Sequence, residues 1–151
     1  MMMMAEDKKQ PFNEVAVRQQ INAFVKAFCS KDLNMMMSLY TPDFRSFDVV
    51  PPLQTVGRDA YRNVWKDAFA LFEDPIEIEL RDVHITTGEE LAFSHKLLRL
   101  HAVRTNGHEV NYWERLTFCF RRIDSEWLIA HEHVSLPADL ARGTVVLDLT
   151  P

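Results

Sequence analysis

The sequence predicts an α+β domain in which helices pack on one face of a curved antiparallel sheet. Apolar residues recur at helical spacing up to Phe72 and alternate with polar residues along much of the chain that follows. Two tight-turn signals, Asn106-Gly107 and Asp124-Ser125, divide that later part into hairpin-linked strands. A length of 151 residues without an internal repeat favours one domain with a substantial core.

Three helices are expected in the first half. Residues 1–10 read as a polar, frayed tail, and Pro11 can open a helix that ends near Ser30. A short helix is expected from Asp32, a good N-cap, to Tyr40, and a third follows Gly57. The apolar stripes of the two longer helices comprise Val17, Ile21, Phe24, Val25 and Phe28, and Tyr61, Val64, Trp65, Ala68, Phe69 and Phe72.

The expected strands begin with a short one over Phe44–Val49, which turns Phe44, Ser46 and Asp48 to one face. Val50-Pro51-Pro52 ends it, because proline cannot donate to a ladder. The later strands are expected over residues 76–81, from Leu91 to about Val103, and in two runs within Val110–Ser135.

Turn geometry fixes the register of these strands. If Asn106-Gly107 is a two-residue turn, Thr105 pairs with His108; if Asp124-Ser125 is one too, Phe118 faces His131. One face would then carry His95, Leu97, Arg99, His101, Tyr112, Glu114, Leu116, Phe118, Ile129, His131, His133 and Ser135. We expect this face to line a small-molecule pocket with an apolar floor.

The opposite face is expected to be an apolar patch, formed by Leu98, Leu100, Trp113, Leu128 and Val134. Such a patch is larger than monomers usually expose, so it predicts a homodimer. The extension over residues 137–151 is too apolar to float freely, and we expect it to dock on its own or the partner subunit.

Composition narrows the class of function. The net charge of −5 with scattered basic residues argues against a nucleic-acid surface, and no apolar run approaches the length of a membrane span. The N-terminus lacks a secretory pattern, so a cytoplasmic protein is expected. His131-x-His133 with a carboxylate could bind a transition metal, but no Glu or Asp stands at a recognisable spacing. No metal or cofactor is therefore predicted.

Three segments of the chain resemble the nuclear transport factor 2-like superfamily. They are Leu39–Phe44, Phe47–Pro52 before Gly57–Ala60, and Trp127–Ser135. The closest similarity is to SnoaL-like domains, also called ketosteroid-isomerase homologues, and it assigns residues 11–136 to such a domain. The last segment is also similar to the association domain of calcium/calmodulin-dependent kinase. The resemblance implies a cone-shaped sheet enclosing a cavity, and usually a dimer.

The same resemblance implies site residues. In ketosteroid isomerases a carboxylate on the first strand moves the proton, while a tyrosine and a protonated aspartate form the oxyanion hole. These positions fall on Asp48, Phe24 and Phe118, so the base is kept and both donors are lost. The candidate catalytic residues are Asp48 and His131; the candidate ligand-binding residues are Phe24, Trp65, His95, Tyr112, Phe118 and His133.

Three kinds of function remain open. As an enzyme, the protein would use Asp48 for general acid or base chemistry on a small, largely apolar, carbonyl-bearing molecule. As a binding module it would hold such a molecule without turnover, and as an assembly module it would use the outer sheet face. Asp48 could instead cap backbone amides in the turn over Val49–Leu53, as aspartate commonly does.

Overall fold

The structure is a computed structural model that describes residues 6–151, with side chains from residue 11 onwards. Within residues 6–151 the chain forms three helices and eight strands. The helices are α1 (Glu6–Ser30), α2 (Leu33–Ser38) and α3 (Arg58–Ala70). The strands are β1 (Tyr40–Phe47), β2 (Thr55–Val56), β3 (Glu77–Thr87), β4 (Leu91–Val103), β5 (Glu109–Ile123), β6 (Glu126–Ser135), β7 (Ala138–Asp139) and β8 (Thr144–Val145).

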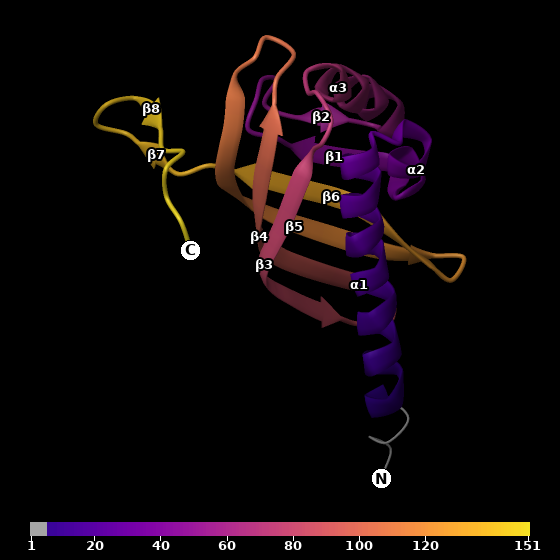
Figure 1. The fold of residues 1–151 in the computed structure, drawn as a ribbon. Helices are drawn as coiled ribbons and strands as arrows, with labels where there is room; N and C mark the ends of the chain where they lie inside the picture. The colour runs from indigo at the N-terminus through magenta and orange to yellow at the C-terminus, as the bar shows by residue number, and fades with distance from the viewer. Residues whose placement is uncertain (1–5) are drawn as a thin grey trace.

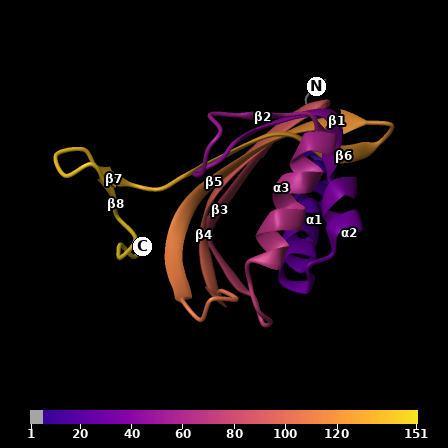
Figure 2. The ribbon, with the colours of Figure 1, turned by 90° about the horizontal axis from the view of Figure 1, so that it is seen from above.

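The main sheet has the strand order β2-β1-β6-β5-β4-β3 (Figure 1). Neighbouring strands in this sheet are antiparallel, with the one exception that β1 runs parallel to β6. The sheet curves around the helices, while the β7–β8 hairpin and the C-terminus lie on its convex side (Figure 2). The predicted α+β class, with helices on one face of a curved sheet, is confirmed.

Two predicted boundaries in the first half were wrong. Helix α1 begins at Glu6, so residues 6–10 are helical rather than a frayed tail, and residues 1–5 lie outside the described part. Pro11 is tolerated inside this helix, where its missing N–H costs one hydrogen bond. Tyr40 belongs to β1 instead of the second helix. The pairing of β1 with β6 is irregular between Tyr40 and Arg45, the stretch that contains Pro42.

The core is an aromatic cluster between the helices and the concave face. Phe24 of α1 packs edge-on against Trp65 of α3 at 5.8 Å and against Phe118 of β5 at 5.0 Å, measured between ring centroids. All three side chains are buried. Offset and edge-on aromatic contacts of this kind add to the stabilisation that burial itself provides. They join α1 and α3 to the concave face of the sheet.

The β4–β5 register differs from the prediction by one residue. Val103 pairs with Glu109, and the Arg104 N–H donates to the His108 carbonyl at 2.8 Å. The loop therefore has three residues, and Gly107 takes its left-handed position at φ 86°. The Asn-Gly pair ends a three-residue turn instead of forming a two-residue one. As a result the even-numbered residues of β4 face inward and the odd-numbered ones outward.

The β5–β6 hairpin follows the predicted register only near its turn. Asp124 and Ser125 both have positive φ, as a two-residue turn requires, and Phe120 pairs with Ile129. Beyond that point Ala130 is an extra residue, so Phe118 pairs with Glu132 instead of His131. This β-bulge reverses the faces of every later residue of β6.

These shifts also correct the predicted apolar patch. Leu98, Leu100 and Val134 are buried in the core, while Trp113 and Leu128 lie on the convex face. The convex face still exposes aromatic surface at other positions. Phe93 is 45% exposed and Phe47 is 38% exposed.

Candidate functional site

Polar side chains gather on the concave face of the sheet. Cross-strand pairing places Ser46 of β1 beside Glu132 of β6, Glu132 beside Phe118 of β5, and Phe118 beside Ser94 of β4. The polar residues of this face are Ser46, Asp48, Ser94, Lys96, Tyr112, Glu114 and Glu132. Tyr40 and Tyr61 add phenol groups beneath them.

Asp48 follows β1 directly and is half-buried. Its Oδ1 accepts a hydrogen bond of 2.7 Å from the Val49 N–H, so part of the expected turn-capping role is present. Burial raises the pKa of Asp48, and the hydrogen bond from Val49 opposes this only in part. Its charge also raises the pKa values of Glu132 and Glu114, so the three carboxyl groups are close enough for their charges to interact.

Glu132 is the residue that the sequence prediction missed. Only 1% of it is exposed, and the Tyr40 hydroxyl donates to its Oε1 at 3.1 Å. Tyr40 in turn accepts a hydrogen bond of 3.3 Å from the Trp65 indole N–H. Burial raises the pKa of Glu132 to about 7, although hydrogen bonds from Tyr61 and Tyr40 oppose the shift. A buried carboxyl that titrates near neutrality can hold or release a proton.

Lys96 is a buried amine close to the same carboxyl. It is 3% exposed, donates to Ser94 Oγ at 3.0 Å and lies 3.7 Å from the centre of the Phe118 ring. Burial lowers the pKa of Lys96 to about 7, opposed by the charge of Glu132.

Glu114 and Tyr112 lie nearer the start of β5 than Phe118 does. Both are half-buried, and they pair across the ladder with the apolar residues Leu98 and Leu100. Burial, together with the charge of Asp48, raises the pKa of Glu114 to about 8. The pKa of Tyr112 is also raised, mainly by burial and then by the charge of Glu114.

The three predicted site histidines lie on the convex face instead. His95 stacks on His84 with centroids 5.0 Å apart, and His131 and His133 both contact the Phe47 ring. His131 Nδ1 is 2.7 Å from the Arg45 carbonyl oxygen. The predicted placement of these histidines in the pocket was wrong because the register shifts by one residue on both sides of β5.

The other predicted residues do come together on the inner side. Phe24, Trp65 and Phe118 form the aromatic floor, while Asp48 and Tyr112 stand above it with Glu114. The β5 assignments were right because that strand keeps a simple alternation. No signal in the sequence marks the bulge at Ala130. Without that bulge, Glu132 is expected on the convex face, so nothing in the sequence indicates that its side chain lies in the core.

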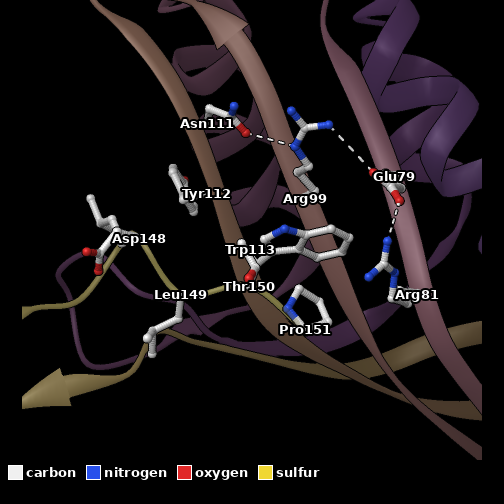
Figure 3. Close-up of a pocket in the computed structure, with 11 residues that line it drawn as sticks. Glu79, Arg81, Arg99, Asn111, Tyr112, Trp113, Asp148, Leu149, Thr150 and Pro151 are labelled. Carbon is white, nitrogen blue, oxygen red and sulfur yellow. Dashed lines mark hydrogen bonds and ion pairs between the residues drawn. The ribbon is translucent and has the colours of Figure 1, made fainter.

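A separate open pocket of about 370 Å³ lies on the convex face, beneath the C-terminal tail (Figure 3). Its sheet side is formed mainly by Arg81, Arg99 and Trp113, and Glu79 bridges the two guanidinium groups. Residues 147–151 of the tail form the other side. The tail thus lies over its own sheet, away from the concave carboxyl groups.

A sequence profile of SnoaL-like domains matches residues 17–139. The chain belongs to the SnoaL-like domain family. Comparison with curated proteins gives no match. Within the described residues, no helix is long and apolar enough to cross a membrane. In the same part of the chain, no three His, Cys, Asp or Glu side chains are grouped so that they could hold a metal ion.

Solved structures share this SnoaL-like fold over most of the chain. An NTF2-like protein of unknown function from Pseudomonas putida is 27% identical, with a TM-score of 0.85, over 93% of this chain and 98% of that one. A ketosteroid isomerase-like protein from Erwinia carotovora is 19% identical, with a TM-score of 0.72, over 83% and 97%. An NTF2-like superfamily protein from Salmonella enterica is 19% identical, with a TM-score of 0.74, over 84% and 92%.

Proposed function

We propose that this SnoaL-like protein binds a small, largely apolar, carbonyl-bearing molecule at the open end of the cone and moves a proton on it through Asp48. The observation that carries the proposal is the half-buried Asp48 carboxyl on the concave face, with its pKa raised by burial. A carboxylate in that condition is a stronger base than one in water and suits general acid–base chemistry near neutral pH.

The surroundings of Asp48 favour a ligand that is mostly apolar. Beside it lies the apolar cluster of Phe24, Trp65 and Phe118, which is itself buried. The Asp48 carboxylate would repel an anionic ligand. The likeness to a ketosteroid isomerase-like protein is consistent with chemistry at a carbonyl, although at 19% identity it supports the fold alone.

The proposal is tested by deuterium exchange at the carbon atoms beside the carbonyl of 2-tetralone, a neutral bicyclic ketone, followed by NMR in heavy water. The wild-type protein should accelerate the exchange, and Asp48→Asn should reduce the acceleration at least about 100-fold, the usual range for loss of a general base. Asp67→Asn, an exposed aspartate on α3, is the matched control and should exchange as the wild type does.

If the ketone binds without any exchange, the protein is a binding module and the catalytic part of the proposal fails. If Asp48→Asn exchanges as fast as the wild type, another group is the base. If Asp48→Asn mainly lowers stability, its hydrogen bond to the Val49 amide is its principal role.

We also propose a homodimer through the convex face. Phe93 and Phe47 present aromatic surface there, which is costly to leave in water. Sedimentation at micromolar concentration should show a dimer, and Phe93→Glu should shift it towards monomer. Leu53→Glu, at an exposed apolar position in the loop after β1, is the control and should leave the dimer intact. A wild-type monomer under these conditions would refute the proposal.

A further inference from the structure

Four histidines lie together on the convex face of the sheet, arranged as two pairs. His84 of β3 pairs across the ladder with His95 of β4, and their rings stack with centroids 5.0 Å apart. His131 and His133 lie two residues apart on β6, so both project from the same face, and their ring centroids are 6.5 Å apart. We call these four residues the histidine row. They take no part in the concave site.

The histidine row crosses the sheet from β3 to β6. His95 pairs with Thr117 of β5, and Thr117 pairs in turn with His133. One strand therefore separates the two pairs. His84, His95 and His133 are exposed and His131 is half-buried, so a ligand that approaches the convex face meets imidazole rings.

The ring nitrogens of the row are largely free. In the part of the chain whose side chains the structure describes, no hydrogen bond or ion pair engages the rings of His84, His95 or His133. His131 Nδ1 lies 2.7 Å from the Arg45 carbonyl oxygen, which can only accept, so Nδ1 of the neutral ring carries the proton and Nε2 keeps its lone pair. Histidines that bind metal ions commonly have one ring N–H held by a carbonyl in this way.

Neutral imidazoles without partners are ligands for transition-metal ions. Ring nitrogens suit Zn²⁺, Cu²⁺ and Ni²⁺, and Zn²⁺ normally takes four ligands in a tetrahedron. Within the described residues, no third His, Cys, Asp or Glu joins either pair to make a metal-binding group. Each pair therefore supplies half of a zinc site and leaves the other half open.

The open half lies on the surface through which we propose the homodimer. Phe47 of β1 pairs with His133, and Phe93 stands two residues before His95 on β4. The two exposed phenylalanines of the proposed interface thus border the histidine row. A second copy seated on these phenylalanines covers the row as well.

A symmetric dimer brings the pairs of two copies together, because in such a contact the same patch faces itself. A two-fold axis that lies between the sheets near Thr117 sets histidines of one copy opposite histidines of the other, whether it runs along β5 or across it. Two histidine rows contain eight imidazoles, which are the ligands of two tetrahedral ions, or one ion per chain.

We infer that the histidine row binds Zn²⁺ between two copies of the chain, each ion being held by one histidine pair from each copy. The inference rests on the proposed homodimer and is independent of the proton transfer proposed for Asp48. Zinc links the two sheets. It also gives partners to imidazoles that the interface would otherwise bury unpaired, which costs stability.

Sedimentation of the full chain in ZnCl₂ and in an excess of EDTA tests whether zinc links two copies. Zinc should tighten the dimer at least about 10-fold relative to EDTA, because an ion that binds the dimer more tightly than the monomer favours the dimer by mass action. His95→Gln and His133→Gln each remove one ligand, from different pairs, and each should remove most of this tightening. Both side chains are exposed, so both variants should fold. His108→Gln, at an exposed histidine in the loop between β4 and β5, is the matched control and should behave as the wild type does.

Co²⁺ in place of Zn²⁺ reports on the ligands directly. Tetrahedral Co²⁺ absorbs visible light much more strongly than Co²⁺ in water does, so titration of the wild type should produce this absorption and saturate at about one ion per chain. His95→Gln and His133→Gln should weaken the absorption, and His108→Gln should not. Histidines that serve packing alone would not produce it.

The outcomes separate this inference from the earlier proposals. If the wild type is an equally strong dimer in zinc and in EDTA, the inference is overturned and the proposed homodimer stands. If zinc tightens the dimers of His95→Gln and His133→Gln as much as that of the wild type, other groups bind the ion and the inference is overturned. A wild-type monomer in both solutions overturns the inference together with the homodimer, while the exchange of 2-tetralone still tests Asp48. A monomer in EDTA that becomes a dimer in zinc supports the inference and makes the interface dependent on the metal.

Discussion

Replacing Glu132 by glutamine should stabilise the protein increasingly as the pH rises. Glu132 is 1% exposed, and burial raises the pKa of its carboxyl from an ordinary value of 4.5 to about 7. At about 1.4 kcal/mol per pKa unit, holding this carboxylate charged in the folded state costs about 3 kcal/mol. Glutamine stays neutral and can still accept the hydrogen bond from Tyr40.

The direction of this pH dependence follows from how tightly Glu132 binds its proton in the folded and unfolded states. Because the folded protein binds this proton more tightly than the unfolded chain, the stability of the wild type is fully present below about pH 4.5 and falls until about pH 7. Above about pH 7 the folded protein bears the full cost of holding Glu132 charged. The gain from Glu132→Gln should therefore be close to zero at pH 4.5 and about 3 kcal/mol at pH 8.

Urea unfolding of wild type and variant at pH 4.5, 6 and 8 measures this difference. Glu126→Gln, an exposed glutamate at the start of the same strand, is the control and should change the free energy of unfolding by less than about 0.5 kcal/mol. A difference for Glu132→Gln that is constant with pH, or that becomes destabilising at pH 8, would refute the reasoning that Glu132 is held in a desolvated site.

Four further outcomes are expected. Lys96→Met should have the opposite pH dependence. Burial lowers the pKa of Lys96 in the folded protein from 10.5 to about 7, so the wild type loses stability as the pH falls between these values. The gain in stability from the variant, measured by urea unfolding, should therefore be largest below pH 7. Asp32→Ala should lower the free energy of unfolding by about 1 kcal/mol, because the Met35 N–H at the start of α2 loses its cap of 3.0 Å. NMR titration should give His101 a pKa above its ordinary 6.5, because glutamates on the neighbouring strands bond both ring nitrogens, and substituting glutamine for either of them should lower it. Deletion of residues 137–151, which removes the tail lying over Trp113, should lower the melting temperature or change the oligomeric state; no change in either would show that the tail contributes nothing.

The order of elements could be read from the sequence because it depends on local chemistry. Asp32 caps α2 as predicted, and the alternation along β5 correctly placed Tyr112, Glu114 and Phe118 on one face. These features are set within a few residues, where hydrogen bonding and side-chain periodicity decide the outcome.

The partners of β5 could not be predicted in the same way. The Asn106-Gly107 pair is compatible with both a two-residue and a three-residue turn, and only the packing of the core selects the latter. Placing Lys96 inward and His95 outward follows from that choice. The bulge at Ala130 is likewise a tertiary feature, and it exchanges His131 for Glu132 at the centre of the site.

The parallel pairing of β1 with β6 has a consequence for how the protein is made. Arg45 and His131, which are neighbours in the sheet, are separated by 86 positions in the chain. During synthesis β1 therefore emerges long before β6 has been made. The edge of β1 that pairs with β6 remains unpaired until β6 has been translated. Contacts between distant segments slow folding and leave strand edges open to association with other chains. We expect the emergence of β6 from the ribosome, more than the appearance of any earlier helix, to time the moment at which Asp48 reaches its position.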